Sequence, residues 1–421
     1  MLKIRQIVFL VLTCVPIKPT YAETSLTAEL ATAGPGTLIE LPSGDYGTLV
    51  LKGGGGTPEN PIVVRAANPA DPPRFIGLAL DGVAHVVLDG LIFDYSFTAG
   101  DPIYVQPFKV SKSRDVTIRN TLFDGDVARG VSVADDGFGY GIGLTVRWSN
   151  GFTLQTSEIR GFHRGLGISE SDNITLRGNE IHALRSDGIN CAQVKNVLIE
   201  GNYIHDFLRS LASSDHSDMV QFWTTRTTTP SREITIRDNV LNSGKGAYTQ
   251  SIFMRNELVD QGKAGPEMFY RDVTITGNVI INAHLHGITV GETDGLTIAN
   301  NTLVQNPASM GPEDNPMVFI PQIRVVATAI NVNILRNVAY KIDPPPLRSG
   351  WVISKNYAVQ NRTRAEGGFY NLVFANPERG DPRDLTSFAY RPDGPLFGAG
   401  RGASRLDAGQ PTIHAGRYTA P

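Results

Sequence analysis

Cysteine is almost absent from this chain of 421 residues, which contains only Cys14 and Cys191. Cys14 lies in an N-terminal segment that we expect to be removed, so the remaining chain cannot form an intramolecular disulfide. Charged residues are also scarce, at 19% of the sequence, with a net charge of −3 and no block of lysine or arginine. Because nucleic-acid-binding proteins carry a basic patch, we expect no nucleic-acid partner.

Long hydrophobic runs are missing too, and no stretch approaches the roughly 18 apolar residues of a membrane span. A short apolar run at residues 7–15 follows a basic start and precedes Thr20-Tyr21-Ala22, which has small residues where a signal peptidase reads. The pattern predicts a signal peptide over residues 1–22, cleaved after Ala22. A lipoprotein signal at Cys14 is less favoured, because Thr13 is a poor residue before a lipid-modified cysteine. We expect a periplasmic or secreted monomer.

One phrase recurs eight times along the chain: an apolar–polar–apolar strand, an asparagine, and two residues that are mostly apolar. The copies begin at Val116, Phe152, Ile174, Val197, Ile234, Val273, Leu296 and Val332. Their spacing is either 22–23 or 36–39 residues, which indicates one repeating unit with insertions. A leucine-rich repeat would carry the Leu-x-x-Leu-x-Leu pattern, which is absent, and propeller blades need longer units with four strands. A unit of this length is typical of one coil of a β-helix.

The repeat resembles right-handed parallel β-helix proteins, in which each coil contributes short strands and stacked side chains fill the interior. It therefore predicts an all-β fold. An asparagine shared by six copies should stack as an internal ladder. These residues are Asn179, Asn202, Asn239, Asn278, Asn301 and Asn337. We expect an N-terminal cap over residues 23–35 with a helix at 26–33, a β-helix domain over 36–343, and a C-terminal flank over 344–421.

The third strand of each coil can be aligned on a Gly-apolar-x-apolar pattern, which sends polar side chains to one outer face. The first predicted column on that face is Tyr140, Arg164, Asp187, Asp218, Gln250 and His286, and the second is Asn190, Gln221, Phe253 and Thr289. The preceding turns add Arg185, His216, Tyr248 and His284. Insertions at 208–216 and 258–270 should wall this face, so it is the predicted groove.

Residues 215–223 give the strongest local indication of a functional site. A carboxylate beside His216 can orient the imidazole and raise its basicity, while Gln221 and Trp223 can bind and stack a sugar ring. Asp187 and Asp218 on neighbouring strands should lie roughly 5 Å apart and repel unless a proton or cation lies between them. With Asp215 they form a candidate Ca²⁺ site.

Residues 42–46, 53–65 and 86–93 resemble the opening coils of chondroitinase-B-like and alginate-lyase-like polysaccharide lyases. The resemblance implies a carbon–oxygen lyase that cleaves a uronate-containing acidic polysaccharide by β-elimination after removal of the C5 proton. In that reaction Arg255 with Gln221, or Ca²⁺ at Asp187 and Asp218, neutralises the uronate carboxylate. His216 is the expected base, and Tyr248 or His284 the expected acid. The substrate would contact Arg185, Asn190, Trp223, Gln250, His286, Tyr140 and Arg164.

Three other functions stay open. A uronate C5-epimerase would use the same groove and return a proton from the opposite side. The phrase Ser186-Asp-Gly-Ile is similar to one in polygalacturonase-like hydrolases, which would make Asp187 and Asp218 the pair of an inverting hydrolase. Such a pair stands about 6.5–9.5 Å apart, and Ser217 replaces that family's paired second aspartate. The third of these alternatives is a non-catalytic periplasmic carbohydrate-binding β-helix.

Overall fold

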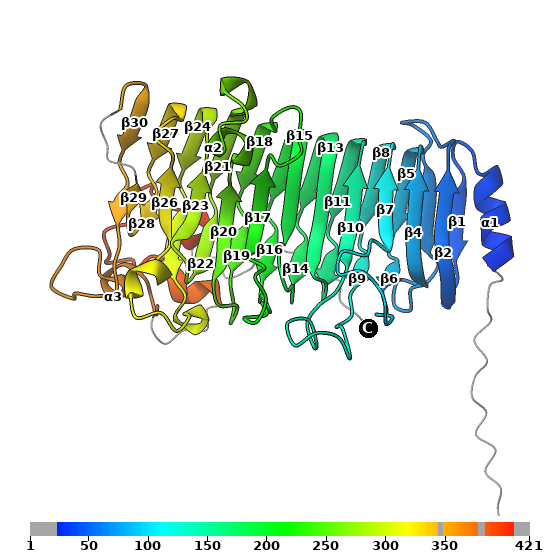
Figure 1. Cartoon of the computed structure of the whole chain (residues 1–421), viewed down its shortest axis with the longest axis horizontal. Coiled ribbons are helices and arrows are strands. Elements are labelled where there is room, and N and C mark those ends of the chain that lie inside the picture. Colours follow the sequence, from blue (N-terminus) through cyan, green and yellow to red (C-terminus); the bar gives the residue numbers. More distant parts are fainter. Residues whose placement is uncertain (1–22, 344–347, 378–383, 408–421) are drawn as a thin grey trace, which may run out of the picture.

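The computed structural model describes residues 23–343, 348–377 and 384–407, so the predicted signal peptide lies outside the described residues. The chain forms one elongated solenoid of parallel strands, with α1 (Glu23–Thr32) across its N-terminal end (Figure 1). Leu26 and Leu30 of α1 are buried in the core cluster, so the helix covers the open end of the solenoid. The predicted all-β right-handed parallel β-helix with a capping helix is confirmed.

The strand pairings divide the solenoid into three faces. The first face contains β1 (Leu38–Leu41), β3 (Ile62–Ala66), β5 (Ala84–Asp89), β8 (Arg114–Arg119), β11 (Asn150–Gln155), β18 (Arg232–Arg237), β21 (Tyr270–Thr276), β24 (Thr293–Ala299), β27 (Ile330–Leu335) and β30 (Trp351–Ser354). The second contains β7 (Phe108–Ser111), β10 (Ile142–Arg147), β17 (Ser217–Trp223), β20 (Thr249–Met254), β23 (His286–Val290), β26 (Gln322–Val325) and β29 (Ile342–Asp343). The third contains β6 (Ile92–Asp94), β9 (Leu122–Asp124), β12 (Glu158–Arg160), β14 (Glu180–His182), β16 (Tyr203–His205), β19 (Val240–Asn242), β22 (Val279–Asn282), β25 (Thr302–Gln305), β28 (Val338–Ala339) and β31 (Tyr357–Ala358).

Four longer strands pass from one face to the next. β13 (Arg164–Arg177) and β15 (Ile189–Glu200) begin on the second face and end on the first. β2 (Asp45–Lys52) and β4 (Arg74–Asp81) connect the third face to the second. The second face is therefore continuous from the N-terminal coils to β29.

The predicted asparagine ladder runs inside the turn between the first and third faces. Asn239 is fully buried, and its Nδ2 donates to Ile199 O and to Asn278 Oδ1, both at 2.9 Å. Its Oδ1 in turn accepts hydrogen bonds from the backbone N and the Nδ2 of Asn202. Each buried amide thus forms a hydrogen bond with a backbone group of a neighbouring coil. This removes the free-energy cost of burying both polar groups.

The ladder extends beyond the six predicted asparagines. The Oδ1 of Asn179 accepts from the backbone N of Ser157, and Asn337 donates to Asn356 Oδ1. Asn356 belongs to a ninth copy of the phrase, which forms β30 and β31 beyond the predicted boundary at residue 343. Three prolines at 344–346 separate this copy from the eighth and hide the repeat in the sequence.

The C-terminal flank packs against the outer surface of the third face. It contains α3 (Tyr370–Val373), η4 (Leu385–Phe388) and α4 (Ser404–Asp407). Phe374 and Tyr390 form a second apolar cluster with outward-facing Val240, Val279 and Ile281 of that face.

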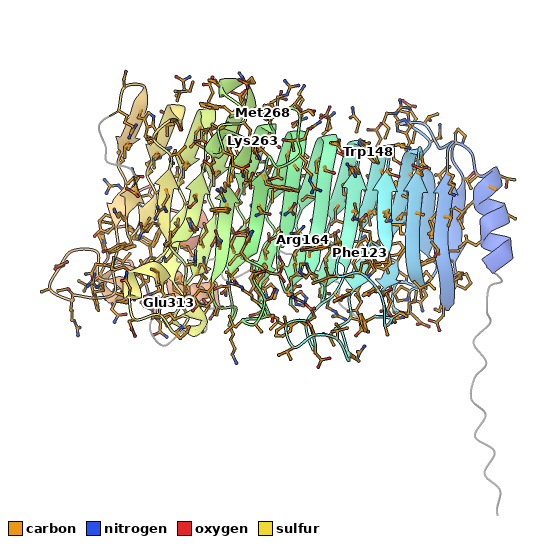
Figure 2. The ribbon with its side chains drawn as sticks, viewed as in Figure 1. Phe123, Trp148, Arg164, Lys263, Met268 and Glu313 are labelled. Carbon is orange, nitrogen blue, oxygen red and sulfur yellow. The ribbon has the colours of Figure 1, made fainter. Side chains whose placement is uncertain are left out.

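Loops border both edges of the second face. One edge has the loop that carries α2 (Glu257–Asp260) and η1 (Pro266–Met268), and Figure 2 shows Lys263 and Met268 of this loop. The opposite edge has loops 95–107, 125–141, 206–216 and 306–321, the last with η2 (Pro307–Ser309), η3 (Pro316–Phe319) and Glu313. Loops 125–141 and 306–321 are longer than the predicted insertion at 208–216. None of the helices in the described ranges is both long and apolar enough to cross a membrane.

Candidate active site

The second face aligns polar side chains on neighbouring coils. The pairings Leu166–Ile189 and Ile189–Val220 place Arg164, Asp187 and Asp218 in one column, and Asp218 pairs directly with Gln250. The adjacent column holds Asn190, Gln221, Phe253, Thr289 and Arg324. Arg324 is an extension of this column that the sequence alignment missed.

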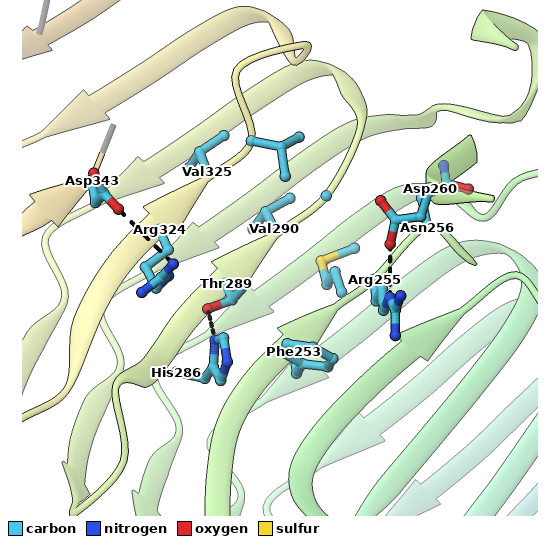
Figure 3. Close-up of a pocket in the computed structure, with 13 residues that line it drawn as sticks. Phe253, Arg255, Asn256, Asp260, His286, Thr289, Val290, Arg324, Val325 and Asp343 are labelled. Carbon is cyan, nitrogen blue, oxygen red and sulfur yellow. Dashed lines mark hydrogen bonds and ion pairs between the residues drawn. The ribbon is translucent and has the colours of Figure 1, made fainter. Parts of the chain in front are cut away.

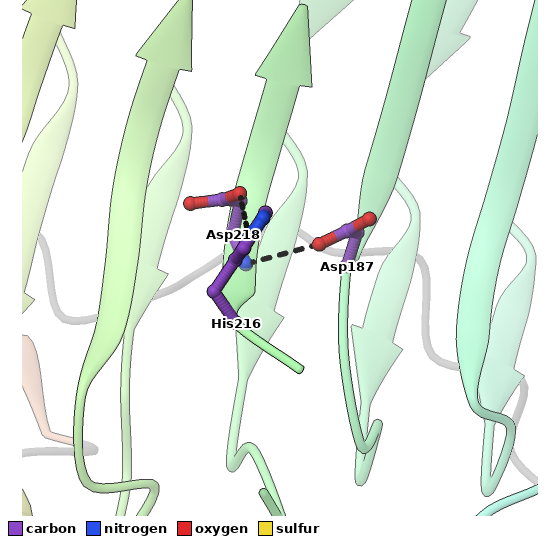
Figure 4. A group of neighbouring side chains, drawn as sticks. All are labelled: Asp187, His216 and Asp218. Carbon is purple, nitrogen blue, oxygen red and sulfur yellow. Dashed lines mark hydrogen bonds and ion pairs between the residues drawn. The ribbon is translucent and has the colours of Figure 1, made fainter. Parts of the chain in front are cut away.

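Asp187, His216 and Asp218 form a compact cluster at the start of β17 (Figure 4). One ligand atom from each of the three residues lies within 4.8 Å of the others. The Nδ1 of His216 is 3.0 Å from Asp218 Oδ2. The His216 side chain is 54% exposed, whereas both aspartate side chains are 0% exposed. The imidazole therefore covers the carboxylates, and its Nε2 has no hydrogen-bond partner among the described residues.

Amide and guanidinium groups hold the two carboxylates in place. Asn190 Nδ2 donates to Asp187 Oδ2 at 2.9 Å, and Gln221 Nε2 donates to Asp218 Oδ2 at 2.8 Å. Arg164 Nε forms a 3.0 Å ion pair with Asp187 Oδ2. Asn190 and Gln221 were predicted to bind substrate, but they are buried and their amides support the carboxylates instead. Trp223 Nε1 donates to Asn190 Oδ1 at 2.7 Å, which fixes the half-exposed indole beside them.

The electrostatics of the cluster suit proton transfer. The hydrogen bond with Asp218 raises the pKa of His216, because the carboxylate stabilises the imidazolium. Burial raises the pKa of Asp218 to about 6, with the Asp187 carboxylate adding to the shift. An exposed imidazole oriented by a buried carboxylate is an arrangement that can remove a proton from a ligand.

Ca²⁺ does not fit the donors of this cluster. Calcium takes about 6–8 oxygen ligands, whereas the Oδ2 atoms of Asp187 and Asp218 already accept hydrogen bonds from amides. Among the described residues the buried Asp218 Oδ1 lacks a hydrogen-bond partner, but the third group of the cluster is an imidazole, which calcium does not favour.

Two predicted site residues have structural roles instead. Arg185 was predicted to bind substrate, but its side chain is 1% exposed and pairs with Asp135 at 2.6 Å and Asp215 at 2.8 Å. Asp215 was predicted to bind metal with Asp187 and Asp218, but it faces His163 and Arg185, and these contacts hold its pKa below its usual value. Arg185 therefore ties loop 125–141 to loop 206–216.

Two other predicted positions are wrong. Tyr140 was aligned with Arg164, but Ile142 pairs with Arg164, and Tyr140 is buried with its ring against Phe97. Arg255 lies beside Trp223 in the pairing register, seven residues beyond His216, or roughly 23 Å along the strand. It pairs with Asp260 at 2.7 Å, so the structure does not place it beside His216.

Tyr248 and His284 follow His216 on the next two coils, at equivalent positions before β20 and β23. The hydrogen bond with Glu313 raises the pKa of Tyr248, so the phenol is protonated and can donate a proton. Burial lowers the pKa of His284 to about 4, so this imidazole is neutral at pH 7. Tyr248 is thus the better candidate acid of the two.

Tyr104 is a further exposed group beside the cluster that the sequence alone did not reveal. Its ring is 45% exposed and lies 5.0 Å from the guanidinium carbon of Arg164. An exposed aromatic ring of this kind can stack on a sugar. It lies in loop 95–107, before the first copy of the repeat, where the alignment of coils gave no signal.

Comparisons with known proteins agree on the fold. Residues 136–339 match the family model described as right handed beta helix region. The chain is similar to the crystal structure of PfbA, a surface adhesin of Streptococcus pneumoniae, at 12% identity and a TM-score of 0.51, covering 82% of this chain and 92% of that one. It also resembles pectate lyase Pel9A (15% identity, TM-score 0.43, 88% and 84% covered). A third similar structure is the PL6 family alginate lyase AlyGC (14% identity, TM-score 0.45, 91% and 56% covered).

No curated protein matches the sequence. The parallel solenoid and the matching family model together show a right-handed parallel β-helix fold. A shared fold alone does not select one activity.

Proposed function

We propose that this protein is an exported polysaccharide lyase that cleaves a uronate-containing acidic polysaccharide by β-elimination. The observation that carries the proposal is the exposed His216 imidazole, oriented by buried Asp218, beside the cation Arg164 on the second face. A uronate lyase needs a base next to a group that neutralises the sugar carboxylate, because the C5 proton becomes acidic only when that charge is compensated.

In the proposed reaction Arg164 binds the uronate carboxylate. Its Nε pairs with Asp187, and its two terminal nitrogens have no hydrogen-bond partner in the described part of the chain. The side chain is 28% exposed, so these donors can reach a ligand. Arg164 replaces Arg255 in this role, since Arg255 is too far along the strand from His216.

The Nε2 of His216 takes the C5 proton of the bound sugar. The electron pair of the C5–H bond forms the C4–C5 double bond, and the C4–O4 bond breaks. Tyr248 on the next coil gives its phenolic proton to the departing O4 oxygen. Tyr104 and Trp223 offer aromatic surfaces to neighbouring sugars.

Burial argues against an inverting hydrolase. That mechanism needs one carboxyl in contact with the glycosidic oxygen and another that activates a water. Both Asp187 and Asp218 are 0% exposed, and both are occupied by the amides of Asn190 and Gln221. The groups that can touch a substrate here are an imidazole, a guanidinium and a phenol.

A panel assay tests the proposal. The purified protein is incubated with polymers of galacturonate, mannuronate, guluronate and glucuronate, and the ultraviolet absorbance of unsaturated uronate ends is followed. A lyase produces this absorbance with at least one polymer. New reducing ends without the absorbance would identify a hydrolase. A change in C5 configuration without chain cleavage would identify an epimerase, and binding without any product would identify a carbohydrate-binding protein.

A further inference from the structure

A groove on the second face lies beyond the catalytic cluster, across β20, β23 and β26 (Figure 3). It has a volume of about 270 Å³. The residues that line it include Phe253, Arg255, His286, Thr289, Val290 and Arg324. Phe253, Thr289 and Arg324 belong to the same column as Asn190 and Gln221, so the groove is continuous with the surface beside His216.

The two arginines of the groove differ in their partners. Arg255 Nε donates to Asp260 Oδ2 at 2.7 Å, so that charge is already paired. Arg324 forms a looser ion pair with Asp343, at 4.0 Å, which is too long for a hydrogen bond. The Arg324 side chain is 38% exposed, and its guanidinium has no hydrogen-bond partner among the described residues. Such a planar fork of N–H donors matches a carboxylate.

The remaining walls suit a sugar ring rather than a free ion. The Phe253 ring lies 5.0 Å from the His286 ring at 69°, which leaves an apolar surface next to Arg324. His286 Nδ1 is 2.7 Å from Thr289 Oγ1. The groove thus combines one cation with unpaired donors, an aromatic ring and a hydroxyl, the groups that bind an acidic sugar.

The groove is well separated from the catalytic cluster. Three coil steps lead from β17 to β26, and Arg324 aligns with Gln221, five residues beyond His216. With strands about 4.8 Å apart and a rise of about 3.3 Å per residue, the separation is roughly 20 Å. A disaccharide bound at His216 cannot span that distance, whereas a hexasaccharide can.

We propose that the groove is a second carboxylate-binding site, in which Arg324 pairs with the carboxylate of a uronate several units away from the sugar at His216. This inference rests on the proposed function, since it concerns the same acidic polysaccharide. The site gives the protein a preference for long chains, because only they occupy both positions.

The test measures binding of saturated disaccharides and hexasaccharides of galacturonate, mannuronate and guluronate, in a His216→Ala background that prevents turnover. Arg324→Gln should weaken the dissociation constant of the best hexasaccharide roughly ten- to hundred-fold, the range for a charge-assisted hydrogen bond. Disaccharide binding should not change. Arg324→Lys, which keeps the charge but loses the fork, should fall between Arg324→Gln and the parent.

Arg232→Gln is the matched control, because it removes an exposed charge from β18 on the first face. A methyl-esterified galacturonate hexasaccharide should bind Arg324→Gln and its parent equally, since it lacks the charge that Arg324 recognises. Circular dichroism confirms that each variant is folded.

The outcomes separate this inference from the proposed function. If Arg324→Gln and Arg232→Gln bind the hexasaccharides equally, or if no member of the panel binds, the second site is refuted. If hexasaccharide binding depends on Arg324 but no polymer yields unsaturated ends, the site stands and the lyase proposal fails.

Discussion

The substitution Asn239→Leu removes one rung of the internal ladder with little change in side-chain volume. The Oδ1 of Asn239 is the acceptor for the backbone N of Asn202 at 2.9 Å and for its Nδ2 at 3.0 Å. Both donors stay buried when the acceptor is lost, and each buried unsatisfied group costs about 1–3 kcal/mol. We therefore expect the free energy of unfolding to fall by about 2–6 kcal/mol.

Urea denaturation followed by circular dichroism measures this loss. Asn150→Leu is the matched control, because Asn150 is exposed at the start of β11 and accepts one hydrogen bond from Asn173. Asn150→Leu should change the free energy of unfolding by no more than about 0.5 kcal/mol. Equal losses in the two variants would refute the reasoning, since only the donors that bind Asn239 are buried. Turnover of folded Asn239→Leu protein should be normal, because the ladder lies between the other two faces.

Three further predictions concern the chemistry. The value of kcat/KM should fall as the pH drops through the raised pKa of His216, because the base becomes protonated. Asp218→Asn should move this acidic limb of the pH profile to lower pH, because the carboxylate that stabilises the imidazolium is gone. An unmoved limb would contradict the pairing of His216 with Asp218. Excess EDTA should leave the turnover of the purified protein unchanged, and a loss restored by Ca²⁺ would show that the cluster binds metal. Tyr248→Phe should lower kcat by roughly 10²–10⁴ while the ring still packs against Arg209, and a normal kcat would exclude Tyr248 as the acid.

The sequence was sufficient to predict the fold because each copy of the repeat contains the residue types that the turn requires. The residue before each ladder position has positive φ, for example Asn120, Gly178 and Asp238 with φ of 50°, 63° and 56°. Glycine, asparagine and aspartate tolerate that conformation, and the next position needs a buried amide or hydroxyl. Both constraints recur once per coil, so the period and the ladder are visible in the sequence.

The errors in the site arose where the period is broken. Gly141-Ile-Gly-Leu and Gly143-Leu-Thr-Val both satisfy the strand pattern, and the structure uses the second, which leaves Tyr140 outside the column. Arg324 was missed because the register shifts between His286 and Ile288, so the next strand lacks the expected glycine. The buried Arg185 pairs with Asp135, which lies in a loop between the coils. The repeat pattern does not predict where that loop lies relative to the coils.

The most direct test of the central claim compares His216→Ala with the unaltered protein in the assay for unsaturated uronate ends. The account predicts that kcat falls roughly 10²–10⁴-fold, the usual contribution of a positioned base. The fold should be retained, because the side chain is 54% exposed. Near-normal formation of unsaturated ends by a folded His216→Ala protein would contradict the account.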